Sequence, residues 1–140
     1  MTLTNQANYA LRAMMFLSRE NTGEWISSAV VAEAMGIPRM FLSRINMQLV
    51  DAGLIKSRRG AGGGIKLAKN PESISLYEVL DAIDGPLILD KCLGSPEEPT
   101  FPMADQYRSF FQDAQKILVD KFSQTSLKDL VEDHHSEDSG

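Results

Sequence analysis

Hydrophobic residues recur at steps of three and four along most of this 140-residue chain, which predicts a mainly α-helical fold. The first helix is expected over residues 2–19, with Thr2 or Thr4 as its N-cap. Its apolar side consists of Leu3, Ala7, Ala10, Met14 and Leu17.

Two further helices are expected close together. The second begins at Ser27 or Ser28 and ends at Gly36, where a tight turn leads into the third. Pro38 suits the first turn of the third helix because its missing N–H needs no partner there, and Gly53 suits the end. The inward side is expected to be Val30, Val31 and Ala34 in the second helix, and Leu42, Ile45, Leu49 and Ala52 in the third.

After the third helix the pattern changes to that of short strands. Leu54-Ile55 and Ile65-Lys66-Leu67 flank a basic, glycine-rich segment, which predicts a small β-hairpin. Trp25-Ile26 is expected as another short apolar strand or as a hydrophobic staple, with the tryptophan in the core. Glycines allow positive φ and close backbone approach, so a low hairpin can press its arginines against phosphates. A P-loop does not fit because no Gly-Lys-Ser/Thr sequence follows, and a solvated glycine turn is the simple alternative.

Helix, turn, helix and hairpin in this order indicate a winged helix-turn-helix, which lays its third helix into the DNA major groove. Met47 lies on the exposed face of that helix, and the start of the second helix offers free N–H groups to a phosphate. Tyr9 and Arg12 of the first helix are either DNA-backbone contacts or plain surface residues. The candidate DNA-contacting residues are Ser28, Arg39, Met40, Ser43, Arg44, Lys56, Arg58, Arg59, Gly62 and Gly63.

The net charge of −5 argues against nucleic-acid binding until it is divided along the chain. Residues 1–70 hold nine Lys/Arg and four Asp/Glu, a balance of +5. Residues 71–140 hold five Lys/Arg and fifteen Asp/Glu, a balance of −10. The basic half matches the charge that phosphate binding requires, and we expect the acidic half to face away from DNA.

Beyond residue 70 the sequence predicts three parts. Ser75-x-x-Glu78 matches a capping box that opens a helix ending at Gly85. Residues 85–102 hold four prolines, two glycines and the only cysteine, which is typical of a functional or disordered loop. The expected organisation is a winged helix-turn-helix DNA-binding domain (1–70), a connecting helix with a sensor loop (71–102), a long dimerisation helix with a last short helix (103–132), and a disordered acidic tail (133–140).

A broad apolar stripe runs along residues 103–124. The small winged helix leaves little to cover it, so an antiparallel homodimer is favoured over packing against the same chain. A twofold dimer reads palindromic DNA whose half-sites lie about one helical turn, or a multiple, apart. The stripe, which is the predicted dimer interface, consists of Tyr107, Phe110, Phe111, Ala114, Ile117, Leu118 and Phe122.

Several motifs resemble the Rrf-two family of bacterial winged-helix transcriptional regulators, of the IscR/NsrR/CymR type. They are Tyr9-Ala10-Leu11-Arg12-Ala13, Ile37-Pro38-x-x-Phe41-Leu42, Gly53-Leu54-Ile55-x-Ser57-x-Arg59-Gly60 and Gly62-Gly63-Gly64. The resemblance covers residues 1 to about 125. It implies a dimeric DNA-binding transcription factor, often a repressor, with Arg59 in the minor groove and Arg39, Met40, Ser43 and Arg44 facing the major groove.

The resemblance also bears on cofactors. Cluster-binding members carry three cysteines before the long helix and a fourth ligand from a histidine or an acidic residue. Here Cys92 occupies the first position, Glu97 or Glu98 and Ala104 stand near the others, and Asn8 replaces an acidic ligand. Iron–sulfur clusters are held mainly by thiolates, so one cysteine argues against a standard cluster. An unusual ligand set or sharing across a dimer stays open, and no cofactor is assigned.

Cys92 is the candidate sensor residue. Lys91 beside it favours the thiolate, which would make it oxidisable. The simplest alternative is an inert cysteine, with the signal carried by a small molecule or a protein co-regulator.

Composition narrows the remaining classes. A single cysteine, no apolar run of about 20 residues and no secretory leader predict a cytoplasmic protein without a membrane segment. Residues 1–133 contain no histidine, and no nucleophile–base pair is visible, so the chain is not expected to be an enzyme. The alternative to a DNA-binding regulator is a winged-helix protein-interaction module without DNA binding.

Overall fold

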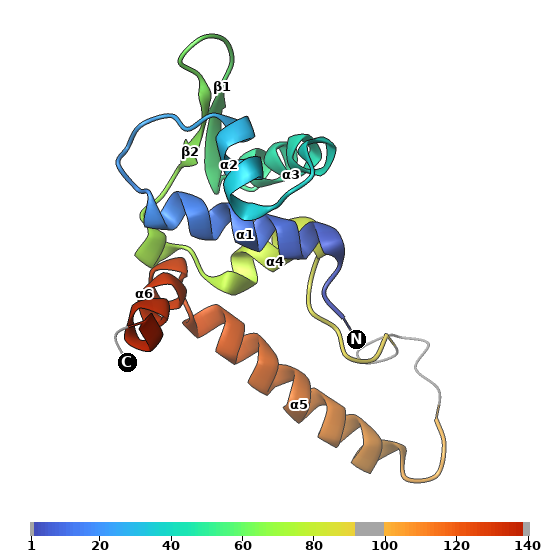
Figure 1. Ribbon diagram of the computed structural model, residues 1–140. Coiled ribbons are helices and arrows are strands. Elements are labelled where there is room, and N and C mark those ends of the chain that lie inside the picture. Colours follow the sequence, from blue (N-terminus) through green and yellow to red (C-terminus); the bar gives the residue numbers. More distant parts are fainter. Residues whose placement is uncertain (1, 92–99, 139–140) are drawn as a thin grey trace.

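The computed structural model describes residues 2–91 and 100–138 and shows a mainly helical chain with one two-stranded antiparallel sheet, as predicted (Figure 1). The elements in chain order are α1 (Asn5–Arg19), α2 (Ser28–Met35), α3 (Arg39–Asp51), β1 (Ile55–Arg58), β2 (Gly64–Leu67), the short 3-10 helix η1 (Pro71–Ser73), α4 (Leu76–Asp84), α5 (Ala104–Gln124) and α6 (Leu127–Asp138).

Helix α1 is the centre of the folded body. It packs against α2, α3, α4, α6 and β2, and its buried residues join one continuous core. Burial of these side chains from water is the main force that holds the helices together. The largest fully buried side chains are Met14, Val31, Leu42, Ile45, Leu49, Leu54, Ile55, Ile65, Ile74, Val79 and Leu127.

The start of α1 corrects one expectation. Thr4 is the N-cap and accepts a hydrogen bond from the Ala7 N–H at 3.1 Å. The Thr4 hydroxyl also donates to the Asp84 carboxylate at 2.8 Å, which joins the start of α1 to the end of α4. Leu3 therefore precedes the helix and is 53% exposed, whereas the sequence placed it on the buried side.

The helix-turn-helix forms as predicted, with small shifts at its ends. Ser27 caps α2, and Gly36 adopts φ +65° between the two helices. Pro38 is the N-cap of α3 rather than its first residue, and Gly53 at φ +75° ends the turn that follows α3. The inward positions were partly wrong because α2 is short and α3 ends at Asp51: Val31 and Ala32 are buried, while Val30, Ala34 and Ala52 are exposed.

The predicted hairpin is present and gains a third partner. β1 and β2 pair antiparallel with Ile55 opposite Leu67 and Arg58 opposite Gly64. Ile26 adds a bridge to Ile65 through two backbone hydrogen bonds of 2.8 and 2.9 Å. The hairpin, hereafter the wing (residues 55–67), is thus anchored to the segment before α2.

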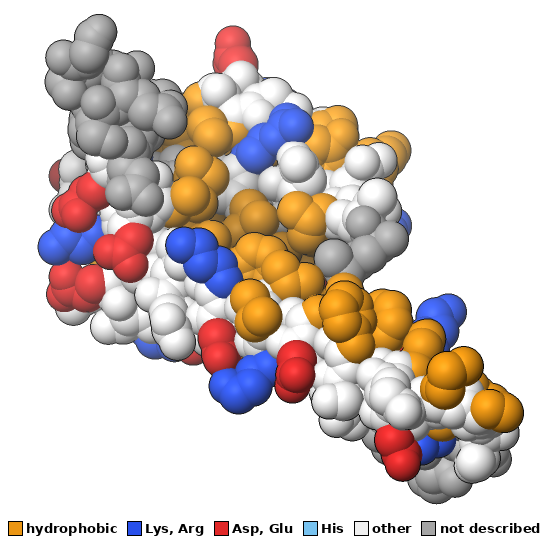
Figure 2. Space-filling view, turned by 90° about the horizontal axis from the view of Figure 1, so that it is seen from below, with side chains coloured by type: hydrophobic (Ala, Val, Ile, Leu, Met, Phe, Trp, Pro, Cys, Tyr) orange, Lys and Arg blue, Asp and Glu red, His pale blue; other side chains and the backbone are white. Residues whose placement is uncertain are grey.

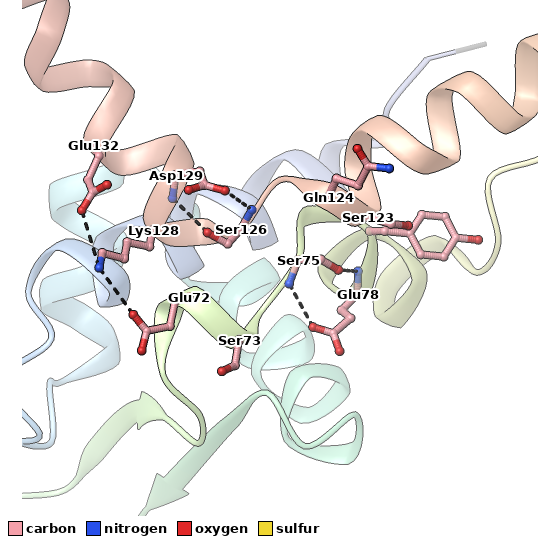
Figure 3. A pocket seen from close by; sticks show the side chains of 11 residues that line it. Glu72, Ser73, Ser75, Glu78, Ser123, Gln124, Ser126, Lys128, Asp129 and Glu132 are labelled. Carbon is pink, nitrogen blue, oxygen red and sulfur yellow. Dashed lines mark hydrogen bonds and ion pairs between the residues drawn. The ribbon is translucent and has the colours of Figure 1, made fainter.

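Two capping boxes meet where α4 and α6 begin (Figure 3). Ser75 and Glu78 exchange hydrogen bonds at the start of α4, and Ser126 and Asp129 do the same at the start of α6. A β-bridge joins Ser75 to Ser126 between them. Lys128 pairs with Glu72 at 3.4 Å beside a cleft of about 690 Å³, so the charged groups there partly satisfy one another.

Helix α5 projects away from the body (Figure 1) and, within the chain, buries only Ala104. Its predicted apolar stripe divides into two parts. Phe111, Ala114, Leu118 and Phe122 are half-buried, whereas Tyr107, Phe110 and Ile117 are 41%, 67% and 69% exposed. Figure 2 shows hydrophobic side chains following α5 and continuing onto the underside of the body.

The last segment differs from the expected organisation. The stretch 103–132 holds the expected long helix and the start of the expected last helix, which the bridge at Ser126 separates. The expected disordered tail at 133–140 is helical as far as Asp138, since α6 continues without a stop signal. Within the residues that the structure describes, no helix is long and apolar enough to cross a bilayer.

Candidate nucleic-acid interface

The exposed face of α3 lies directly opposite its buried stripe. Leu42, Ile45 and Leu49 point into the core, so a helical repeat of 3.6 residues turns the other side toward solvent. That side carries both charge and apolar surface, and all of its members are exposed: Arg39, Met40, Ser43, Arg44 and Met47.

The wing adds a second set of cations. Lys56, Arg58 and Arg59 are exposed on β1 and at the tip that follows it. Arg58 lies 6.0 Å from the ring centroid of Trp25, and Lys66 lies 4.5 Å from the same centroid. Cations over an indole face are attracted by its quadrupole, so half-buried Trp25 helps to hold the base of the wing. The tryptophan predicted for the core serves here as a support.

A groove of about 430 Å³ lies between α3 and the wing. It brings together residues that are distant in sequence but share one surface. Its lining includes one acidic residue, Asp51, beside two arginines of the wing. The lining residues are Ser28, Ser43, Asn46, Met47, Val50, Asp51, Ser57, Arg58, Arg59, Gly64 and Ile65.

Four cations of this surface are unpaired within the described part of the chain. The side chains of Arg39, Arg44, Lys56 and Arg59 make no hydrogen bond or ion pair there. Guanidinium groups carry several donors in a fixed fork, and such donors are held ready for an anion when no internal partner uses them.

The α2–α3 turn is supported from below by α1. Arg12 donates to the backbone oxygens of Met35 and Gly36 at 3.3 and 3.2 Å, and it lies 5.3 Å from the Tyr9 ring centroid. The Tyr9 ring in turn packs against Phe41 at a centroid distance of 5.5 Å. Tyr9 and Arg12 thus hold the start of α3.

Not every candidate residue is free to meet a ligand. Ser28 is half-buried, and its hydroxyl accepts a hydrogen bond from the Asn46 amide at 3.1 Å, so it joins α2 to α3. The Gly63 N–H already donates to the Gly60 carbonyl oxygen at 3.0 Å in the wing turn, while Gly62 is exposed at φ +75°. The other candidates, including Met40 and Ser43, lie on the exposed surface.

Seven residues that line the groove are absent from the candidates predicted from sequence: Asn46, Met47, Val50, Asp51, Ser57, Gly64 and Ile65. The hydrophobic spacing of the third helix already predicts that Met47 is exposed. The same spacing could therefore have added Met47 to the candidate DNA contacts. Asn46 and Asp51 were missed because they lie at the edges of α3 and meet the groove only when the wing folds beside them. Cys92, the candidate sensor, lies outside the described residues.

Comparisons with known proteins agree with this geometry. The profile of the Rrf2 family, described as "Iron-dependent Transcriptional regulator", matches residues 3–133. The HTH-type transcriptional regulator NsrR of Geobacillus kaustophilus is 31% identical over 137 residues, covering 97% of this chain and 93% of NsrR. Among solved structures, T. potens IscR superposes with a TM-score of 0.75 at 25% identity, covering 96% and 88% of the two chains. The oxidized form of Staphylococcus aureus CymR gives 0.71 at 29%, covering 94% and 97%. These matches confirm the predicted winged-helix fold and a regulator rather than an enzyme.

The family description names iron, which raises the question of whether the side chains of this chain can ligate an iron–sulfur cluster. Among the described residues no group of three or more His, Cys, Asp or Glu side chains could hold a metal ion. The whole chain has one cysteine, so two copies supply only two of the four thiolates of a cysteine-ligated cluster. Asn8, in the place of an acidic ligand, is exposed and neutral. These residues do not fit a standard iron–sulfur cluster.

Proposed function

Because the chain belongs to the Rrf2 family of transcriptional regulators, we propose that it binds double-stranded DNA through α3 and the wing and thereby represses transcription. The observation that carries this proposal is a set of four exposed cations, unpaired within the described residues, on the two elements that flank one groove: Arg39 and Arg44 on α3, and Lys56 and Arg59 on the wing. Neutralising DNA phosphates releases condensed counterions, so such a surface favours DNA over a neutral partner.

The two elements have different tasks in this proposal. The wing and the starts of the helices contact phosphates and set the register, while Arg59 reaches into the minor groove. Arg39, Ser43 and Arg44 contact base edges in the major groove, where an arginine can donate two hydrogen bonds to guanine. Such a pair discriminates against a wrong base by about 1–3 kcal/mol.

A homodimer follows from the exposed part of α5. Phe110 and Ile117 are 67% and 69% exposed, and the band of apolar side chains continues onto the body (Figure 2). Contiguous apolar surface of this kind marks an interaction site. A second copy packed antiparallel along α5 would cover it, and the twofold axis would then require a palindromic operator.

The signal is proposed to act through Cys92. The relative with an oxidized form is CymR, and Lys91 precedes the cysteine in this chain. A thiol near a cation is the kind that oxidises selectively. Since the donor set does not fit a standard cluster, the proposed signal is oxidation of this thiol, and a small ligand or a protein co-regulator is the alternative.

The test is a DNA titration at several salt concentrations with a duplex enriched from a random-sequence library. Arg59→Ala should weaken binding at least about tenfold and lower the slope of log affinity against log salt by about one. The far-UV circular dichroism should stay unchanged because Arg59 has no partner among the residues that the structure describes. Lys121→Ala, which removes an exposed cation of α5, is the control and should bind as the wild type does.

The alternative, a winged-helix module that binds only proteins, makes the opposite prediction. It requires no salt-dependent affinity for any duplex and no effect of Arg59→Ala. Failure to enrich any duplex would favour that module and remove DNA binding from the proposal.

A further inference from the structure

The centre of the exposed face of α3 is apolar, which is unusual for a charged surface. Met40 and Met47 are 77% and 69% exposed, among the most exposed large hydrophobic side chains of the described residues. They are seven positions apart in sequence, so they lie almost one above the other, about two helical turns or about 10.5 Å apart along the axis. Both point away from the core that Leu42, Ile45 and Leu49 fill.

Cations surround these two methionines on the same surface. Arg39 and Arg44 flank Met40 on α3, and Met47 lines the groove together with Arg58 and Arg59 of the wing. The apolar strip therefore lies inside the part of the molecule that is suited to an anionic partner. It is separate from the apolar surface of α5, which belongs to another element on the far side of α1 (Figure 1).

The chemistry of DNA offers one apolar partner at this place. In the major groove the only apolar group on a base edge is the 5-methyl group of thymine. Methionine has a flexible, polarizable side chain that adapts to irregular apolar surfaces. The polar donors and acceptors on the other base edges bind water more strongly than they bind a thioether.

We propose that Met40 and Met47 read thymine methyl groups in the operator, a proposal that rests on the proposed DNA-binding function. The rise of about 10.5 Å corresponds to about three base pairs at about 3.4 Å each. Each half-site then carries two thymine methyls about three base pairs apart, flanked by the positions that Arg39 and Arg44 contact. The apolar centre selects A·T pairs, and the charged edges select guanine and phosphate.

The test replaces single thymines by uracil in a duplex enriched from a random-sequence library. Uracil keeps the base-pairing groups and the phosphate charge of thymine and removes only the methyl group. Burial of one such carbon is equivalent to about fourfold in affinity. We expect a loss of about fourfold at two thymines of each half-site and no loss at the remaining thymines.

Variants of the protein assign each methyl to its residue. Met47→Ala should weaken binding to the thymine duplex and make binding insensitive to uracil at one of the two positions, and Met40→Ala should do the same at the other. Such a double-mutant cycle isolates the contact from indirect effects. The salt dependence should not change in either variant because no phosphate contact is lost. Both side chains are exposed, so the circular dichroism of the variants should equal that of the wild type.

The outcomes separate this proposal from the one on which it rests. If selective, salt-dependent binding persists but uracil has no effect at any position, the methyl contact is wrong and DNA binding stands. If Met40→Ala and Met47→Ala bind as the wild type does, the methionine strip serves another partner, such as a protein. If no duplex binds at all, the DNA-binding function itself fails.

Discussion

Backbone conformation at single glycines determines whether the wing can lie against the body. Gly64 has φ +149°, and a Cβ atom placed on it would lie 2.1 Å from the Ile26 carbonyl oxygen. That oxygen accepts the hydrogen bond that anchors the wing through Ile65. Gly62 also has positive φ, at +75°, but a Cβ there would meet open space. Two glycines two positions apart therefore serve different physical needs.

We predict that Gly64→Ala destabilises the protein by about 2–4 kcal/mol, because the bridge to Ile26 must open and the strained backbone remains. Gly62→Ala is the matched control and should cost about 1 kcal/mol, the strain of positive φ alone. Urea denaturation followed by far-UV circular dichroism measures both. Equal losses in the two variants would contradict the role of the close approach at Gly64.

The arrangement of helices could largely be predicted from the sequence, because hydrophobic spacing reports which side of a helix is buried. Spacing does not report where a helix begins. Leu3 was therefore predicted within the first helix, whereas α1 begins at Asn5 with Thr4 as its N-cap. Contacts between distant elements also escaped prediction. Arg12 reaches Gly36 across 24 positions, and no local pattern distinguishes such an arginine from a surface one.

At the scale of elements, α1 supports α3 from behind. Arg12 connects the last carbonyl oxygens of α2 to α1, and Tyr9 packs against Phe41 in the first turn of α3. The turn between α2 and α3 is thus fixed by contacts from a third helix. Its geometry decides how α3 presents its exposed face.

We predict that Arg12→Ala destabilises the protein by about 1–2 kcal/mol, since two charge-assisted hydrogen bonds to backbone oxygens are lost. DNA affinity should fall as well, because α3 is then less firmly placed, although Arg12 need not touch DNA. Arg19→Ala on the same helix is the control. Arg19 pairs with exposed Glu20 at 3.0 Å and lies 5.5 Å from the Phe16 ring centroid, so its loss should change stability by less than about 1 kcal/mol. Denaturant midpoints and DNA titrations measure the two effects, and equal behaviour of the variants would contradict the support by α1.

At the scale of the whole molecule, basic and acidic residues are segregated. The basic half forms the surface of α3 and the wing, and the acidic half supplies α4, α5 and α6. On α5 the exposed Lys116 pairs with Asp120 at 2.7 Å, and this hydrogen bond raises the pKa of Lys116. The apolar side of the same helix is left uncovered at Phe110 and Ile117. How far α5 stands from the body could not be predicted, since an apolar stripe does not report the distance between its helix and the rest of the chain.

The last prediction concerns that uncovered side of α5. Phe110→Asp and Ile117→Asp each place a charge on the predicted dimer interface without disturbing a buried contact, because both side chains are about two-thirds exposed. We expect both variants to sediment as folded monomers where the wild type sediments as a dimer. Affinity for the palindromic duplex should fall by about 10²–10⁴, to that of a single half-site, because the second half-site no longer gains from linkage.

Gln112→Asp provides the matched control for these variants. Gln112 is exposed on the opposite side of α5, so the same charge there should leave the dimer and its DNA affinity intact. A dimer that persists in Ile117→Asp and Phe110→Asp would show that α5 is not the interface. Another outcome is that the variants are monomers that bind the full palindrome as tightly as the wild type does. In that case the linkage of two half-site contacts through the dimer contributes nothing to affinity, and operator recognition does not depend on dimerisation.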